Sequence, residues 1–239
     1  EAIALSLYYA SMNVVIVGYG NMGKEVEKVL VAREHNIIAT VDPMVKDAEY
    51  SELTKDILSN ADVAIEFSLA DAVVDNARLY SEAAVPAVVG TTGWETHRPD
   101  VTQIFEKSGA YICGSNFSIG AHIFFALSET AARLIAQLPQ YDIFMYEIHH
   151  SKKKDSPSGT ALAAGNRIIS ELERKSAIVT ERLDRRINEH ELHIASVRGG
   201  SVPGVHTVMI DSDADTLEIR HTARNRSGFA SGAVMASEW

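Results

Sequence analysis

The stretch Asn13-Val-Val-Ile-Val-Gly-Tyr-Gly-Asn-Met-Gly23 decides the fold of the first half of the chain. Its four successive β-branched residues predict a strand covered on both faces, and the glycines that follow have the spacing Gly-x-Gly-x-x-Gly. In this pattern Gly18 permits a tight turn, Gly20 lets the backbone approach a pyrophosphate, and Gly23 allows close packing of helix on strand. The helix that opens here would direct its positive N-terminal end at the phosphates. The stretch predicts the first turn of a dinucleotide-binding domain.

Short β-branched runs and longer helical patterns alternate after this turn, which predicts an α/β, doubly wound parallel sheet. A second part begins after Ser118 with a long helical pattern, followed by a strand and by a helix that starts near Thr160 with Ser158 as its N-cap. The further strands are expected over 36–41, 63–67, 87–90, 111–113 and 141–149, and the helices over 22–33, 70–84, 96–107 and 119–138.

Asp42 ends the second expected strand, nineteen residues after Gly23, where an acidic side chain can accept hydrogen bonds from the adenosine ribose. Its charge would repel a 2′-phosphate, which favours NADH over NADPH, and Lys46 is the only nearby cation in the following residues. A packing turn with an incidental surface aspartate is the alternative. Later strand ends, at 66–68 and 90–93, are expected to line the same crevice, or else to be ordinary loops.

Composition limits the classes of function. The chain has 239 residues, of which 46% are hydrophobic, as in an ordinary globular protein. The formal net charge of −10 argues against a general nucleic-acid or anionic-membrane surface, because such partners need an excess of Lys and Arg. No segment predicts a membrane span. The one cysteine, Cys113, excludes an intrachain disulfide, is expected to be a buried structural thiol, and favours a cytoplasmic setting.

One segment, 147–160, concentrates positive and titratable side chains in this acidic chain: Glu147-Ile-His-His-Ser-Lys-Lys-Lys-Asp-Ser-Pro-Ser-Gly-Thr160. Two adjacent histidines at a strand end would point to opposite faces, so only one would be catalytic. Together with the lysines and the amides at the following helix N-terminus, they predict a site for a small polycarboxylate. A solvated lysine loop is the alternative. A metal site is not expected, because no further ligands stand at zinc-ligand spacing.

These residues resemble the signature of the dihydrodipicolinate reductase family of bacterial lysine and diaminopimelate synthesis. The spacing Glu-x-His-His-x-x-Lys-x-Asp-x-Pro-Ser-Gly-Thr is highly specific. The resemblance covers nearly the whole chain from Met12, because it extends through 18–23, 90–93, 115–118, 204–207 and 226–233.

The resemblance implies NAD(P)H-dependent reduction of 4-hydroxy-tetrahydrodipicolinate or dihydrodipicolinate to tetrahydrodipicolinate. It implies that His149 is the acid with Lys153 assisting, and that a small dicarboxylate is held by His150, Lys153, Gly159 and Thr160. Leu69 stands where some members place a cofactor-contacting arginine, which again favours NADH. The expected cofactor contacts are Gly18, Gly20, Asn21, Met22, Gly23, Asp42, Phe67, Gly90, Thr91, Thr92, Ser115, Asn116, Phe117, Arg226 and Phe229.

The family architecture implies a Rossmann-type cofactor domain, 12–118 plus 227–239, and an inserted α+β substrate and tetramerisation domain of mixed sheet, 119–226. It therefore implies a homotetramer. Residues 1–11 are interpreted as the remnant of a cloning tag, and native residues are expected to follow Trp239. Another Rossmann-type small-acid or amino-acid dehydrogenase would share the glycines and Asp42 but lack the 147–160 signature. A catalytically silent nucleotide-sensing module would lack the acid and the carboxylate-binding residues.

Overall fold

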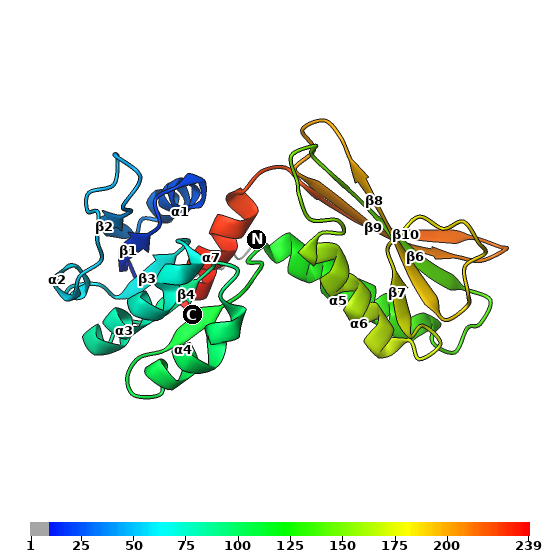
Figure 1. Ribbon diagram of the computed structural model, residues 1–239, viewed down its shortest axis with the longest axis horizontal. Coiled ribbons are helices and arrows are strands. Elements are labelled where there is room, and N and C mark those ends of the chain that lie inside the picture. The colour runs from blue at the N-terminus through cyan, green and yellow to red at the C-terminus, as the bar shows by residue number, and fades with distance from the viewer. Residues whose placement is uncertain (1–9) are drawn as a thin grey trace, which may run out of the picture. The chain divides into compact units, whose positions relative to one another are not determined.

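The structure is a computed structural model that describes residues 10–239 (Figure 1). The chain forms two compact units, one made of the residues up to Ser118 together with Arg226–Trp239, the other of Ile119–Asn225. The expected borders differ from this division at one point only: the chain re-enters the first unit at residue 226 instead of 227. The segment interpreted as a tag remnant falls almost wholly on residues 1–9, outside the described residues.

The first unit holds a five-stranded parallel sheet in the order β2-β1-β3-β4-β5. Its elements are β1 (Asn13–Val17), α1 (Asn21–Ala32), β2 (Asn36–Val41), α2 (Lys55–Leu58), β3 (Val63–Glu66), α3 (Val73–Ala83), β4 (Ala87–Val89), α4 (Arg98–Phe105), β5 (Tyr111–Cys113) and α7 (Ser227–Glu238). The order of strands reverses between β1 and β3, and ligands of doubly wound sheets bind at such a point.

The side chains of β1 alternate between two cores, which explains why the strand is apolar throughout. Val14 and Ile16 belong to a core cluster with residues of α1 and α7. Val15 and Val17 belong to a second cluster with residues of α3 and α4. A sheet covered by helices on both faces leaves no polar face on its central strand. The end of the chain thus supplies one helix of the first unit.

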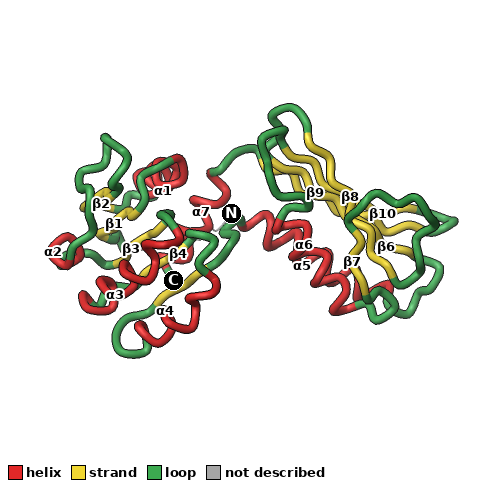
Figure 2. Tube along the Cα trace, viewed as in Figure 1, coloured by secondary structure: helices red, strands yellow, loops and turns green. Residues whose placement is uncertain are grey.

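The second unit pairs its sheet with two helices that lie against one face (Figure 2). Its elements are α5 (Ile119–Ile135), β6 (Asp142–His149), α6 (Gly159–Glu171), β7 (Ala177–Val179), β8 (Glu191–Arg198), β9 (Gly204–Asp211) and β10 (Thr216–Ala223). The strand order is β10-β9-β6-β8-β7. β6 is parallel to β8 and antiparallel to β9, so the sheet is mixed, as expected.

Several expected boundaries are wrong by a few residues for local reasons. The helix expected over 70–84 begins as a 3₁₀ turn at Ala70–Ala72, and α3 ends before Ala84, which adopts a left-handed conformation. A 3₁₀ turn likewise precedes α4, whose first residues include Pro99. Cys113 is half-buried and not buried, because β5 is an edge strand of the sheet. None of the helices in the described part of the chain is long and apolar enough to span a membrane.

The last helix is fixed to the first unit by a buried ion pair. The Glu238 carboxylate accepts hydrogen bonds from Arg33 Nε and Nη2 at 2.6 and 2.7 Å and lies 2.9 Å from His35 Nε2. Only 2% of the Glu238 side chain is exposed, although 38% of the Arg33 side chain remains in water. Burial alone would raise the pKa of Glu238, but the contacts with Arg33 and His35 outweigh it and lower the pKa.

The substitution Glu238→Gln should therefore destabilise the first unit by about 2 kcal/mol at neutral pH, because charge-assisted hydrogen bonds are lost. A folded-state pKa below the unfolded value of about 4.3 stabilises the fold above that pH, and the contribution is lost on further acidification. The difference between the two proteins should shrink below about pH 4.3. Urea titration followed by tryptophan fluorescence reports this unit, since Trp94 and Trp239 both belong to it.

Asp75→Asn is the matched control, because its pair with Arg78 is exposed and should contribute less than about 1 kcal/mol. Equal destabilisation by the two substitutions would contradict the role of Glu238.

Candidate active site

The glycine turn lies at the carboxyl edge of the first sheet. Register pairs Val17 with Glu66, and Glu66 with Val89, so β1, β3 and β4 end level with one another. The residues that directly follow these strands are Gly18, Phe67 and Gly90. Gly18 has φ +88°, and a Cβ there would lie 2.1 Å from the Phe67 carbonyl oxygen. Only glycine fits this turn.

A cavity of about 540 Å³ extends along this edge. It contains two carboxylates, Asp42 and Glu52, and no Lys or Arg stands among its lining residues. The residues that line it are Val17, Gly18, Gly20, Val41, Asp42, Pro43, Met44, Val45, Ser51, Glu52, Leu53, Phe67, Ser68, Leu69, Ala72 and Asn76. The open space beside Gly20, where a Cβ would meet no atom within 4 Å, suits the approach of a pyrophosphate. The cavity therefore fits a dinucleotide.

The Asp42 carboxylate is held in place by the backbone. One oxygen accepts a hydrogen bond from Tyr19 N at 2.8 Å, and the other accepts from Met44 N and Val45 N at 2.8 and 3.0 Å. A carboxylate has about four lone-pair sites, so it keeps capacity for a further donor. Lys46 does not line the cavity, and Lys24 is paired with Asp47 at 2.8 Å.

A smaller cavity of about 230 Å³ gathers residues from distant parts of the first unit. Phe67 and Phe117 meet there edge to face, with ring centroids 6.4 Å apart. The lining residues are Met22, Phe67, Gly90, Gly114, Ser115, Phe117, Arg226 and Phe229. All of these except Gly114 were predicted as cofactor contacts from the sequence, and the fold brings them together.

Five predicted cofactor residues line neither cavity, and three of them have structural roles. Gly23 allows helix α1 to pack on the turn, since a Cβ would lie 2.2 Å from the Gly18 carbonyl oxygen. Thr91 is buried, and its hydroxyl accepts a hydrogen bond from Ser68 N at 2.8 Å. The Asn116 side chain accepts from Ser118 N at 2.8 Å. Asn21 and Thr92 are exposed.

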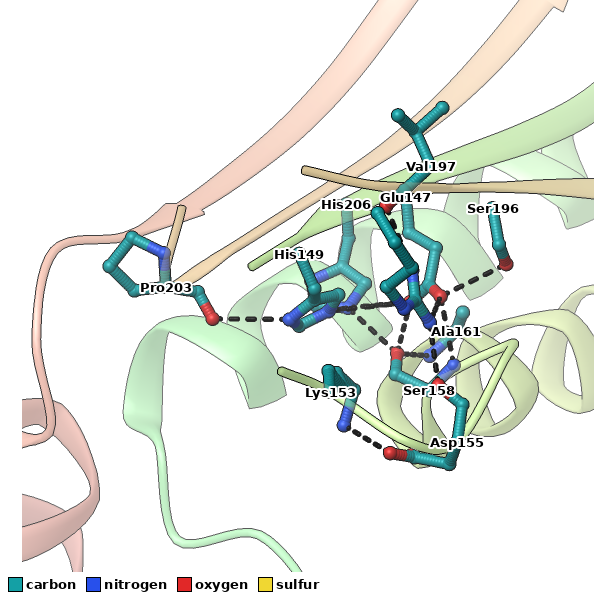
Figure 3. Close-up of polar contacts among 11 residues, drawn as sticks. Glu147, His149, Lys153, Asp155, Ser158, Ala161, Ser196, Val197, Pro203 and His206 are labelled. Carbon is teal, nitrogen blue, oxygen red and sulfur yellow. Dashed lines mark hydrogen bonds and ion pairs between the residues drawn. The ribbon is translucent and has the colours of Figure 1, made fainter. Parts of the chain in front are cut away.

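The second unit carries its chemical groups at the end of β6. The inward face of this strand is apolar at Ile143 and Met145. It then becomes polar at Glu147 and His149, which Figure 3 shows side by side with His206. His206 lies directly opposite Glu147 on β9. Period-two alternation therefore places one acid and two histidines on the face of the sheet that meets the helices.

The Glu147 carboxylate is fully buried and has donors from two elements, the start of α6 and β8 (Figure 3). It accepts hydrogen bonds from Ser158 N at 2.9 Å, Ser196 Oγ at 3.0 Å and Arg198 Nη2 at 2.7 Å, and also from the Ser158 hydroxyl. Burial alone would raise the pKa of Glu147, but the contacts with His206, Ser158 and Arg198 hold it well below its usual value. Glu147 is therefore an anion at neutral pH.

His149 is buried and makes contacts at both ring nitrogens. Its Nδ1 lies 3.1 Å from the Pro203 carbonyl oxygen, and its Nε2 lies 3.2 Å from His206 Nε2 and 3.4 Å from the Glu147 carboxylate. Burial lowers the pKa of His149, and the neighbouring His206 and Lys153 add to this effect against the opposing influence of Glu147. The free protein therefore favours a neutral His149.

The remaining residues predicted to bind substrate lie just after β6. The strand ends at His149, so His150 begins the turn, where it is half-buried. Lys153 is half-buried and pairs with Asp155 at 2.8 Å, whereas the lysines on either side of it are exposed. Gly159 and Thr160 open α6, whose N-cap is Ser158 as expected. The structure places these predicted residues in the loop and helix start that follow His149.

Glu147, His149 and His206 could each offer a metal-ligand atom, and these three atoms lie within 4.8 Å of one another. Sequence spacing did not reveal this group, because His206 comes from another strand. The Glu147 oxygens already accept hydrogen bonds from Arg198, Ser158 and Ser196. These contacts favour a hydrogen-bonded network over a cation site.

Sequence reasoning missed the partners of the buried acid. Ser196 and Arg198 follow Ile194 at every second position of β8, which is the alternation of a strand with one inward face. His206 lies within 204–207, one of the segments that carry the resemblance to the family. The alternation could have indicated that Ser196 and Arg198 lie on the inward face of their strand. It could not have indicated that β8 and β9 pair with β6.

Dinucleotide-dependent oxidoreductases combine a glycine-turn crevice with a second unit that carries acid–base groups, and the chain falls in this class. The N-terminal model of the dihydrodipicolinate reductases matches residues 12–117, and the C-terminal model of the same enzymes matches residues 120–239. The chain belongs to the dihydrodipicolinate reductase family. The resemblance inferred from the sequence is thus confirmed, as is the fold class.

Curated relatives support the same family. The chain is 38% identical to the 4-hydroxy-tetrahydrodipicolinate reductase of Christiangramia forsetii, over 95% of this chain and 92% of the relative. It is 35% identical to the enzyme of that name from Methanococcoides burtonii, over 92% of this chain and 80% of the relative. Dipicolinate-bound dihydrodipicolinate reductase from Paenisporosarcina sp. TG-14 shares the fold with a TM-score of 0.76 at 24% identity, over 95% and 94% of the two chains.

Two neighbouring glycines should respond differently to alanine. Gly18→Ala should destabilise the first unit by more than about 1 kcal/mol, because the positive φ and the Phe67 carbonyl exclude a Cβ. Gly20→Ala should leave stability within about 0.5 kcal/mol, since φ is −73° and space is open, but should weaken NADH binding. Urea titration and NADH fluorescence titration measure the two effects. If Gly20→Ala bound NADH normally, the pyrophosphate would not lie at this turn.

Proposed function

We propose that this chain catalyses the NADH-preferring reduction of 4-hydroxy-tetrahydrodipicolinate, or of dihydrodipicolinate, to tetrahydrodipicolinate in lysine and diaminopimelate synthesis. The observation that carries the proposal is the group at the end of β6, where buried His149 adjoins half-buried Lys153 and the N-terminus of α6. Family membership and the names of the curated relatives support this substrate.

The dicarboxylate would be held by the segment that follows His149. The positive end of the α6 dipole favours anions, and the side chain of Ser158 caps Ala161 N at 3.2 Å. His150 and Lys153 add hydrogen-bond donors or positive charge close to this helix start. We assign the two carboxylates to His150, Lys153, Gly159 and Thr160.

His149 is proposed as the acid, with Lys153 assisting. When bound, the reduced nicotinamide supplies a hydride to the substrate ring. The substrate ring must also take up a proton to complete the reduction. The lowered pKa of His149 favours its neutral form in the free protein. A bound dianion adds negative charge beside the ring and raises the protonated fraction of His149. Its nitrogens contact Pro203 and His206, so one contact must open before transfer, as is common when a free site closes on substrate.

The cofactor would lie along the edge of the first sheet. The larger cavity, with Asp42 and Glu52 and without a lining Lys or Arg, suits the uncharged ribose of NADH better than a 2′-phosphate. Leu69 lines the same cavity, so no cation is gained at the position where some relatives have arginine. Gly90, Phe117 and Arg226 of the smaller cavity are assigned to the nicotinamide end.

A homotetramer is proposed, with the second unit as the site of assembly. α5 and α6 cover one face of its sheet (Figure 1), and on the other face Phe144 and Val197 are 37% and 51% exposed. Burying such a face between subunits would remove apolar surface from water. A cytoplasmic setting is proposed for a biosynthetic enzyme of this family, and the net charge of −10 gives no reason to add a nucleic-acid partner.

The first test is the reaction itself, with substrate generated enzymatically and oxidation of NADH or NADPH followed by absorbance. NADH should support at least as high a kcat/KM as NADPH. Asp42→Ser removes a hydrogen-bonding carboxylate together with its repulsion of the 2′-phosphate. The kcat/KM for NADH should therefore fall, while the kcat/KM for NADPH should rise or stay level. If the wild type preferred NADPH and Asp42→Ser left this preference unaltered, Asp42 would not contact the ribose. Failure to oxidise either cofactor would refute the proposed function.

The adjacent histidines should separate into two roles. His149→Gln should lower kcat by about 100-fold or more with NADH affinity nearly unchanged, because general acid catalysis is lost. His150→Ala should mainly raise KM, as expected for a residue that holds a carboxylate. Steady-state kinetics for both variants distinguish these outcomes, and equal losses of kcat would contradict the division.

A further inference from the structure

The hydrogen bonds around His149 determine where its proton lies when the ring is neutral. Nδ1 is 3.1 Å from the Pro203 carbonyl oxygen, which can only accept a hydrogen bond. Nδ1 must therefore carry the hydrogen, and Nε2 presents a lone pair. That lone pair faces a second ring nitrogen, His206 Nε2, at 3.2 Å, and the Glu147 carboxylate lies 3.4 Å away. Within the pair of ring nitrogens, one must donate.

His206 can meet this requirement in only one tautomer. Its Nδ1 is buried and has no hydrogen-bond partner within residues 10–239. A buried N–H group without a partner is highly unfavourable, so the hydrogen belongs on Nε2. His206 Nε2 lies within reach of three acceptors, which are Ser158 Oγ at 3.0 Å, His149 Nε2 at 3.2 Å and the Glu147 carboxylate at 3.5 Å.

We propose that His206 is a positioning residue of the reductase reaction, which donates its Nε2–H to His149 and holds that ring in one tautomer and one orientation. The proposal rests on the proposed function, since it concerns the residue assigned there as the acid. His206 itself would not touch the substrate. It acts through His149, as the partner of a catalytic histidine does in other enzymes.

The backbone fixes this arrangement from the other side. His206 stands opposite Glu147 in the antiparallel register of β6 and β9, so its ring is brought beside His149 by the sheet itself. Gly204 is the preceding inward position of β9, and a Cβ there would lie 2.8 Å from His149 Cε1. The imidazole of His149 thus lies directly on the backbone, between a carbonyl group and a second imidazole.

The same contacts connect His149 with the proposed site for the substrate carboxylates. Ser158 is both the N-cap of α6 and a neighbour of His206 Nε2, and its hydroxyl donates to Glu147. When His149 takes up a proton at Nε2, His206 can turn its hydrogen bond to Ser158. Because Ser158 directly precedes Gly159 and Thr160, movement of the helix start on anion binding would act on this hydrogen bond. Substrate binding and protonation of His149 would then be coupled.

The donor from His206 favours the neutral form of His149, since it occupies the lone pair that a proton would take. Removing the donor should make His149 easier to protonate. The pH at which the rate falls on the alkaline side should then move upward, even though kcat drops because the ring is no longer held in place. A purely structural role of His206 would lower the rate without moving this pH.

The test compares His206→Leu with His206→Gln in the full-length chain. His206→Leu should lower kcat roughly 10- to 100-fold with little change in KM and shift the alkaline limb to higher pH. His206→Gln should retain most of the activity, because the amide nitrogen can donate from nearly the same place. His193→Gln, on β8 of the same sheet, is the matched control and should behave as the wild type.

Nitrogen NMR of the histidine rings supplies a readout that does not need turnover. In the wild type at neutral pH, His149 should be the Nδ1–H tautomer with a hydrogen-bonded Nε2, and in His206→Leu the Nε2 signal should move toward that of a free lone pair. Gly204→Ala should displace the ring and lower kcat with His206 intact. A wild-type His149 protonated on Nε2, or a His206→Leu variant with unchanged kcat and pH profile, would overturn the proposal.

The NMR result also separates this inference from the proposed function. If the wild type did not reduce the substrate but showed the expected tautomers, the proposed function would be refuted, whereas the hydrogen bond from His206 to His149 would be supported. If the wild type reduced the substrate and His149 had the other tautomer, the positioning role alone would fail. Should His206→Leu not fold, the wild-type spectrum still decides.

Discussion

The arrangement of the second unit depends on one buried charge, the carboxylate of Glu147. Removing an isolated carboxylate from water is unfavourable by several kcal/mol, so the fold must surround it with donors. Those donors come from the start of α6 through Ser158 and from β8 through Ser196 and Arg198. A chain that satisfied this anion in another way would place α6 elsewhere. The requirement thus positions the helix start that we assign to the substrate carboxylates.

Opposite electrostatic conditions prevail in the two units. The larger cavity of the first unit is lined by carboxylates and apolar groups, and backbone amides and glycines leave room for phosphates. The loop after β6 carries three lysines in a chain whose net charge is −10. A dianionic substrate and a dinucleotide both bear negative charge, yet the larger cavity proposed for the dinucleotide has no Lys or Arg among its lining residues. The first unit instead uses the partial charges of the backbone, which a side-chain count does not reveal.

Local rules were sufficient for much of the fold. The β-branched run before Gly18 predicted β1, and the glycine spacing predicted the crevice, because strand burial and turn geometry are decided within a few residues. The N-cap Ser158 was predictable for the same reason. The end of α3 at Ala83 was missed, since it depends on the left-handed conformation of Ala84, and α5 ends at Ile135 and not at residue 138. The family signature contains Glu147, His149 and Ser158, but it did not identify Ser196 and Arg198 as donors to Glu147 or the contact of His206 with His149.

Those groups were out of reach because they belong to strands whose pairing no local pattern specifies. In the sequence, His149 has an adjacent histidine, and alternation of side chains suggests only that the two neighbours have different tasks. The fold gives His149 a different imidazole partner, from a residue 57 positions away, through the antiparallel register of β6 and β9. The pair that matters for protonation is therefore a cross-strand pair. Pro203 and His206 contact opposite nitrogens of the His149 ring. The chemistry of His149 is therefore determined by β9 and the residue before it as much as by the signature on β6.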